Sequence, residues 1–178
     1  VVPTWQSLPE PITIVGMPVA AGDYQYARYR LYYGNDQSKK FSFGLLYETG
    51  GYYNGSLDRY EVRGRFSPMP NIALSVNYQH NTFRSFGENA TNRETDLITP
   101  ELRLALNPRV QLITFYQYNT AVERGVFNGR LSWEYAPLSF VYVVYNDNRQ
   151  TVFNATTMRD DRLANQNGIF KITWMKQF

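Results

Sequence analysis

Polar and apolar side chains alternate residue by residue along much of this sequence. In 59–66, for example, Tyr60, Val62, Gly64 and Phe66 alternate with charged residues. Because successive side chains of a β-strand point to opposite faces of a sheet, a period of two predicts strands with one apolar and one polar face. No segment shows persuasive helical periodicity, so the chain is predicted to be all-β.

Nine segments of this kind are separated by Gly, Asn, Asp and Pro clusters that favour turns. They cover residues 23–33, 39–48, 59–66, 71–79, 96–106, 109–118, 125–135, 139–145 and 168–178. Residues 1–21 are expected to form an extended segment or linker. Residues 22–178 are expected to form one domain, because no domain boundary interrupts them.

The links between these segments alternate in length. Those after the first, third, fifth and seventh segments are short, and those after the second, fourth and eighth are long and polar (49–58, 80–95 and 146–167). Bacterial outer-membrane barrels alternate tight periplasmic turns with longer outer loops. The expected fold is therefore an antiparallel up-and-down meander of about nine or ten strands, forming a transmembrane β-barrel or part of one.

The composition agrees with a barrel better than with a bundle of membrane helices. A spanning helix needs about 18 or more consecutive apolar residues, and the longest such run here is 140–145. Aromatic residues make up 16% of the chain. Several fall near strand ends, where they would suit the headgroup depth of a bilayer: Tyr32, Tyr33, Tyr47, Tyr78, Tyr118, Trp133, Tyr135, Tyr145 and Trp174.

The last segment carries a second membrane signature. Phe170, Ile172 and Trp174 occupy alternate positions, and the sequence ends at Phe178. This pattern resembles the signal that the outer-membrane barrel-assembly machinery reads, although Lys176 stands where that pattern usually has an apolar residue. It predicts the assembly machinery, the lipid bilayer and lipopolysaccharide as partners.

The number of strands has a topological consequence. Bacterial barrels usually have an even number of strands and both ends in the periplasm. Nine strands therefore predict either a short tenth strand at 12–15 or additional strands before Val1. We favour the second.

Charged residues on the predicted strands need a polar environment, because a charge facing lipid near the bilayer midplane costs about 2–4 kcal/mol. They are expected to face a lumen or a partner, where opposite charges on adjacent strands can pair. Two interpretations stay open: a polar passage, or a barrel interior filled by ion pairs. The residues are Arg59, Glu61, Arg63, Arg65, Glu101, Arg103, Arg130 and Glu134.

Other chemistry has weaker support. His80, the only histidine, could form a hydrolase centre at the outer rim with Ser85 and Glu88. Asp147, Asn148, Asp160 and Asp161 lack the spacing of a calcium loop, and the chain has no cysteine. We expect no cofactor, no bound metal and no enzymatic activity. The net charge of +3 is too small to indicate nucleic-acid binding.

Four short motifs resemble an uncharacterised family of Gram-negative bacteria whose members join an N-terminal DOMON-like, carbohydrate-binding-like module to a C-terminal outer-membrane barrel. The similarity spans residues 22–178, and no such module is present here. The family has no established catalytic residues to transfer. The motifs are Glu-Thr-Gly-Gly-Tyr-Tyr-Asn-Gly at 48–55, Gln-Tyr-Asn at 117–119, Trp-Glu-Tyr at 133–135 and Val-Val-Tyr-Asn-Asp at 143–147.

The leading expectation is a non-catalytic β-barrel of the Gram-negative outer membrane that acts as a pore or a membrane anchor. One alternative is a β-rich accessory subunit that packs against a larger membrane protein complex at its periplasmic face. Another is an outer-membrane hydrolase that uses His80.

Overall fold

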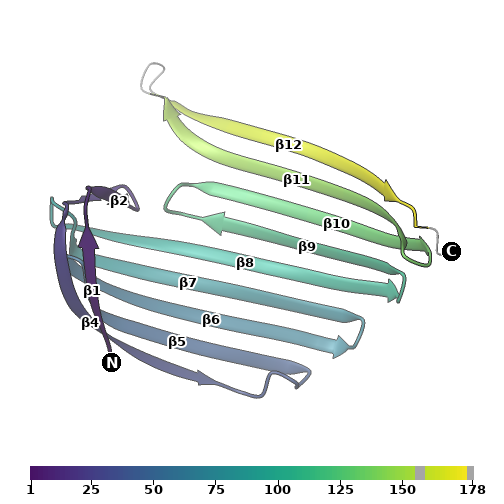
Figure 1. Cartoon of the computed structure of the whole chain (residues 1–178), viewed down its shortest axis with the longest axis horizontal. Coiled ribbons are helices and arrows are strands. Elements are labelled where there is room, and N and C mark those ends of the chain that lie inside the picture. The colour runs from purple at the N-terminus through teal and green to yellow at the C-terminus, as the bar shows by residue number, and fades with distance from the viewer. Residues whose placement is uncertain (155–158, 176–178) are drawn as a thin grey trace.

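The computed structural model describes residues 1–154 and 159–175, with side chains outside 152–161. Ten strands of the described chain form one antiparallel sheet (Figure 1). Neighbouring strands in the sheet are consecutive along the chain, apart from the step from β1 to β4. The sheet strands are β1 (Val2–Leu8), β4 (Gly22–Gly34), β5 (Phe41–Tyr52), β6 (Gly55–Met69), β7 (Ile72–Phe86), β8 (Thr91–Asn107), β9 (Val110–Asn119), β10 (Arg124–Ala136), β11 (Ser139–Asn154) and β12 (Arg159–Thr173). β2 (Ile12–Ile14) and β3 (Met17–Val19) form a separate hairpin.

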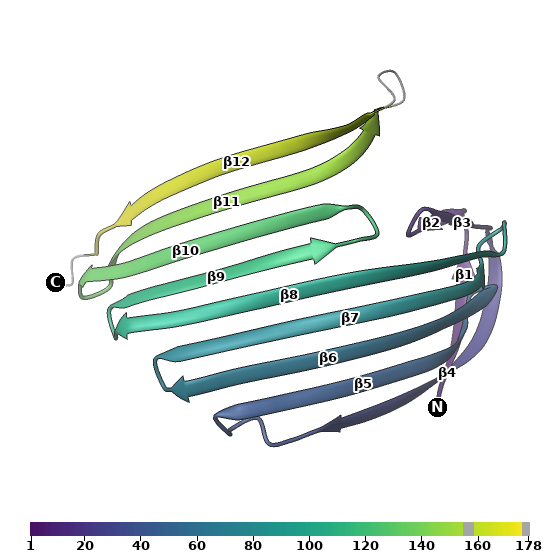
Figure 2. The ribbon, with the colours of Figure 1, turned by 180° about the vertical axis from the view of Figure 1, so that it is seen from behind.

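This architecture confirms the predicted all-β antiparallel meander. The sheet is strongly curved but not closed: β1 and β12 are its two edges, and no pairing joins them in the described residues (Figures 1 and 2). The described residues contain no helix long and apolar enough to cross a membrane.

The tenth strand of the sheet is β1, and the expectation of a strand at 12–15 within the sheet was wrong. β1 pairs with the first half of β4, from Val2 opposite Arg28 to Leu8 opposite Gly22. Pro3 is tolerated because β1 is an edge strand, where a missing N–H costs little. Residues 1–21 are therefore not a linker. They contribute one strand to the sheet and the β2–β3 hairpin.

The links that the sequence analysis took for long loops are mostly strand. The turn between β5 and β6 is residues 53–54, and the turn between β7 and β8 is residues 87–90. At these positions the outer face of the sheet is polar and the inner face mixes polar side chains with apolar ones such as Phe83, so the regular alternation ends. The backbone pairing nevertheless continues, as in Thr82 opposite Glu94. The predicted alternation of long and short loops is therefore wrong for these links.

We call this end of the sheet the tip end, and the opposite end, with turns at 35–40, 70–71, 108–109 and 137–138, the base end. The base-end turn at 35–40 is held by Asp36. Its carboxylate accepts hydrogen bonds from the backbone N–H and the hydroxyl of Ser38, both at 2.9 Å. These two bonds lower the pKa of Asp36.

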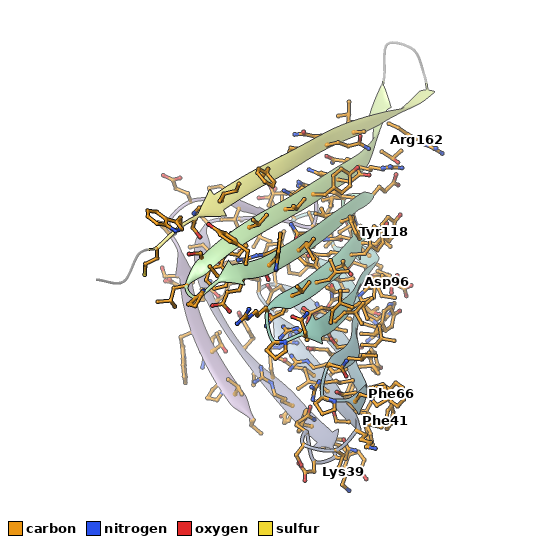
Figure 3. The ribbon with its side chains drawn as sticks, turned by 90° about the vertical axis from the view of Figure 1, so that its right-hand side faces the viewer. Lys39, Phe41, Phe66, Asp96, Tyr118 and Arg162 are labelled. Carbon is orange, nitrogen blue, oxygen red and sulfur yellow. The ribbon has the colours of Figure 1, made fainter. Side chains whose placement is uncertain are left out.

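The strand register separates the side chains into two faces. Residues that pair across the ladder project to the same face, so Arg59 shares a face with Glu48 and Asn81, and Phe66 shares the other with Phe41 and Leu74. We call the first the inner face and the second the outer face. In Figure 3 the labelled outer-face residues Phe41, Phe66, Asp96 and Tyr118 point to the convex side of the sheet.

The largest buried apolar cluster lies at the tip end of the inner face, where the β2–β3 hairpin packs. Val19 and Phe86 are fully buried there, beside Leu8, Met17, Leu57 and Phe83. The Arg93 guanidinium fixes the hairpin by donating to the carbonyl oxygens of Val15 (2.5 Å) and Ala121 (3.1 Å). The conventional core of this protein is therefore small, and most apolar residues lie elsewhere.

Candidate functional site

Most of the apolar side chains of the sheet form a continuous band on the outer face. On β7 the band comprises Ile72, Leu74, Val76 and Tyr78, and each neighbouring strand adds a comparable set. Nothing in the described chain covers it, so many of its members are exposed, including Leu45, Val62, Leu74, Ile98, Val143 and Phe170. A contiguous exposed apolar surface of this extent marks contact with a membrane or another protein.

Aromatic residues dominate the border of this band toward the tip end. Among the described side chains, the last large apolar outer-face residue on each strand, from β4 to β12, is Tyr29, Tyr47, Tyr60, Tyr78, Ile98, Tyr118, Phe127, Tyr145 and Phe170. Beyond the border the outer face becomes polar, with Thr49, Asp58, His80, Asp96 and Asp147.

The border runs obliquely across the sheet. At three steps between neighbouring strands it stays level, as in Tyr78 opposite Ile98. At the other five it moves two residues toward the base end: the partners of Tyr29, Tyr60, Tyr118, Phe127 and Tyr145 are Thr49, His80, Gly125, Asp147 and Gly168. The shift averages about one residue per strand. With a rise of about 3.3 Å per residue and a strand spacing of about 4.8 Å, the border is perpendicular to an axis tilted about 35–40° from the strands.

The inner face carries the charges that the sequence analysis selected. Arg59, Glu61, Arg63, Arg65, Glu101, Arg103, Arg130 and Glu134 all project to it. Their ion pairs form within strands rather than between adjacent strands, which corrects the expectation. Glu61 binds Arg59 at 2.7 Å and Arg63 at 2.5 Å, and Glu101 binds Arg103 at 2.5 Å.

Other inner-face charges were missed by the sequence analysis. Arg28 and Arg30 on β4 both bind Glu48 on β5, at 2.5 and 3.2 Å. Their i, i+2 spacing was the available signal. Basic side chains predominate on the described inner face, which holds Arg28, Arg30, Arg59, Arg63, Arg65, Arg93, Arg103, Arg124, Arg130 and Lys171 against Glu48, Glu61, Glu101 and Glu134.

An amide ladder continues this polar surface toward β12. Asn146 donates to Asn167 at 2.7 Å and accepts a hydrogen bond from Asn128. The Arg130 guanidinium stacks over the Tyr142 ring, 4.9 Å from its centroid. Polar and charged side chains therefore extend across the inner wall, interspersed with apolar ones such as Phe115 and Val144.

The inner wall has a hollow of about 320 Å³ between β5 and β8, closer to the base end. Ser42, Asn77, Thr99, Glu101, Arg63 and Arg65 are among the residues that line it. The Ser42 hydroxyl and the side-chain amide oxygen of Asn77 (Oδ1) make no hydrogen bond within the described chain. Ser42 is 1% exposed.

His80 lies on the outer face, immediately beyond the aromatic border. Its Nδ1 atom is 2.8 Å from the Asp96 carboxylate on β8, and its Nε2 atom is 3.2 Å from the Thr82 hydroxyl. The predicted partners were wrong: the backbone N–H of Ser85 donates to Asn92, that of Glu88 donates to Pro18, and neither residue bonds to His80 in the described chain.

The residues of the terminal signature fall in part on the outer band. Phe170 and Ile172 are exposed there on the edge strand β12, and Trp174 follows the strand, 71% exposed. Phe178 lies outside the described residues. Of the predicted interfacial aromatics, Tyr32 is the exception: it projects to the inner face, where its ring packs against Gly34 and Gly44.

No group of three or more His, Cys, Asp or Glu side chains suited to a metal ion occurs in the described chain. Of the acidic residues considered for calcium, Asp147 pairs with Arg149 at 2.7 Å. The Asp160 and Asp161 side chains lie outside the described residues.

The fold and its two faces define a class: a curved, open antiparallel meander with an apolar band on its convex face and a predominance of basic side chains among the charges of its concave face. Searches against protein-family models, curated proteins and solved structures found no match for this chain. Its function must therefore be inferred from the two faces themselves.

Proposed function

We propose that this chain forms the wall of a transmembrane β-barrel in a bacterial outer membrane and acts as a pore or membrane anchor. The outer band would contact lipid and the inner face would line a water-filled lumen. The oblique aromatic border is the observation that carries the proposal.

A bilayer imposes a level boundary on every strand, whatever the strand tilt. The border of this band becomes level when the strands tilt by about 35–40° from the bilayer normal. Strands of membrane barrels tilt by about 35–45°, so the two ranges agree. On β8 the band spans Ile98 to Leu106, or roughly 20 Å along the bilayer normal after tilting, close to the roughly 25 Å of known barrels.

The competing interpretation is an accessory subunit whose outer band packs against a larger membrane protein complex. A protein partner would bury the band equally well, but it would not require the border to follow a single plane. Nor would it require Tyr residues along that border, a position at which aromatic rings suit the bilayer interface.

Paired substitutions on β8 test the proposal. Leu102 lies in the middle of the outer band, whereas Leu97 projects to the inner face of the same strand. Arginine at 102 should cost about 2–4 kcal/mol in a bilayer, so L102R should sharply reduce the fraction of chain that resists urea extraction from membranes. L97R should insert like the unmodified chain.

The unmodified chain should also migrate differently on a cold detergent gel before and after boiling. A chain that stays soluble without detergent and that urea strips from membranes would contradict the spanning model. That result would favour the accessory subunit.

A second function has one specific observation in its favour. Asp96, His80 and Thr82 form a carboxylate–imidazole–hydroxyl chain of hydrogen bonds, the arrangement that activates a nucleophile for acyl transfer. It lies at the outer aromatic border, where a membrane places its acyl esters. Thr82 would attack the ester carbonyl, His80 would take its proton and pass it to the leaving alcohol, and water would release the acyl group.

Esterase assays on lipid micelles test this second function. Thr82→Ala and His80→Ala should each abolish hydrolysis. Thr49→Ala, on the outer face of β5, should retain it. If the unmodified, membrane-inserted chain releases no fatty acid, the hydrolase is excluded and the pore or anchor is unaffected.

A further inference from the structure

The hollow on the inner wall is lined by charged and polar side chains from four neighbouring strands. Its floor is the sheet backbone at Phe43, Gly64 and Val76, and its rim is formed by inner-face side chains. It lies on the same face as the β2–β3 hairpin but toward the opposite, base end. A volume of about 320 Å³ is at the small end of the range for organic ligands, about 300–1,000 Å³.

Arg65 supplies positive charge at this hollow. The other arginines nearby are committed: Arg59 and Arg63 bind Glu61, and Arg103 binds Glu101. Arg65 forms no ion pair with any described residue. A guanidinium presents a planar fork of N–H donors that matches the oxygens of a carboxylate or phosphate.

Two serines flank Arg65 on the neighbouring strands. Ser42 on β5 and Ser75 on β7 are the direct cross-strand partners of Arg65, and all three line the hollow. The Ser42 hydroxyl is buried and makes no hydrogen bond within the described chain. A buried polar group without a partner is unfavourable, so this row of donors is suited to an oxyanion.

The other side of the hollow offers acceptors. The side-chain amide oxygen of Asn77 (Oδ1) is buried and makes no hydrogen bond within the described chain. Thr99 and Glu101, which also line the hollow, lie on the neighbouring strand β8. A bare inorganic anion would leave these acceptors unused. A ligand that carries hydroxyl groups in addition to its anionic group would satisfy both sides.

We infer that the hollow is a binding subsite for a small hydroxylated organic anion, with Arg65, Ser42 and Ser75 on the anionic group and Asn77 and Glu101 on the hydroxyls. The inference rests on the proposed function, because solutes reach the inner face if it lines a lumen. It deepens that function by assigning a substrate class: the wall would select anionic, hydroxylated solutes, as arginine-lined pores favour anions.

Calorimetric titration of the refolded chain in detergent micelles tests the subsite. The probes are gluconate, which carries a carboxylate, glucose 6-phosphate, which carries a phosphate, and uncharged glucose. We expect saturable binding of one or both anions and at least tenfold weaker binding of glucose, about the effect of one charge-assisted hydrogen bond. Which anion binds identifies the anionic group.

Two variants assign the binding to the hollow. Arg65→Gln should weaken anion binding about tenfold or more, and Ser42→Ala should weaken it by a smaller factor. Arg109→Gln removes the same charge from an exposed base-end turn and should leave binding unchanged. Equal losses in R65Q and R109Q would reduce the effect to general charge and overturn the subsite.

Membrane insertion is measured on the same preparations. Absence of saturable binding of both anions by a chain that passes the urea-extraction and cold-gel tests would overturn the subsite alone. Failure of those two tests would overturn the barrel instead, whatever the titration shows.

Discussion

At the scale of single residues, Glu61 illustrates how the inner face accommodates so many arginines. Only 3% of its side chain is exposed, and its two oxygens bind Arg59 and Arg63 separately. The Arg63 side chain is 67% exposed, so water shares in neutralising that partner. Glu61 therefore acts mainly by separating two like charges that are four residues apart on one strand face, each two residues from Glu61.

Replacing Glu61 with Gln should remove this separation. The arginines would then repel each other beside a neutral amide, and we expect a loss of about 1–3 kcal/mol in the free energy of unfolding. Urea unfolding in micelles, followed by tryptophan fluorescence, measures it. Glu101→Gln is the matched control: its pair with Arg103 is exposed, so it should cost at most about 1 kcal/mol. Equal losses would contradict the role assigned to Glu61.

At the scale of elements, the β2–β3 hairpin is the one pair of described strands that lies outside the main sheet. It packs against the β7–β8 turn, where Gly87 has φ = +76° and the Glu88 N–H donates to the Pro18 carbonyl. A Cβ atom on Gly87 would lie 2.7 Å from the Pro18 oxygen. The turn and the hairpin therefore fit only with glycine at this position.

Gly87→Ala should displace the hairpin from the inner face. Contact with Pro18 and the positive φ together should cost about 1–3 kcal/mol, and proteolysis within residues 9–21 should become faster while the sheet remains intact. Gly64→Ala provides the control, since a Cβ atom there would have no neighbour within 4 Å. If both variants are cleaved at the same rate as the unmodified chain, the hairpin is not held by this contact.

The elements also show which parts of the fold the sequence could predict. Between the base-end turns and the aromatic border, one face is apolar and the other polar, and the predicted strands there are correct. Toward the tip end the outer face is polar, as at Thr82, and the inner face mixes polar and apolar residues, as at Asn81 and Phe83, so no regular alternation marks the continuing strand. β1 was missed for a related reason, because Pro3 and Gln6 resemble a linker and its only partner is a distant segment of β4.

The candidate site was predictable to the same extent. Alternation assigned Arg59, Glu61, Arg63 and Arg65 to one face, because a face depends only on parity along the strand. It could not provide the neighbours that each residue has on other strands. Those neighbours depend on register, which places Ser42 and Ser75 beside Arg65 and Asp96 opposite His80.

At the scale of the whole molecule, the two faces impose one orientation on the sheet. In water the outer band would expose apolar surface at a cost of about 25 cal/mol per Å². In a bilayer the same band is favourable, but only if its border is level. The aromatic border drifts by about one residue per strand, so the strands themselves must be inclined for all nine border residues to reach the same depth.

This requirement predicts a measurable angle. In oriented bilayers the amide I dichroism of the inserted chain should give strands tilted about 35–40° from the membrane normal, the inclination that levels the border. A partner-bound sheet has no such constraint. Tilts near zero or near 90° would place Tyr29 and Phe170 at very different depths and would contradict lipid contact along the whole band.

A level border also predicts the effect of displacing it on two strands. Tyr145→Asn together with Phe127→Asn moves the border toward the base end on β10 and β11 alone, so the border is no longer level there. This double variant should insert into bilayers less efficiently than a variant with two inner-face substitutions, Val144→Asn and Val126→Asn.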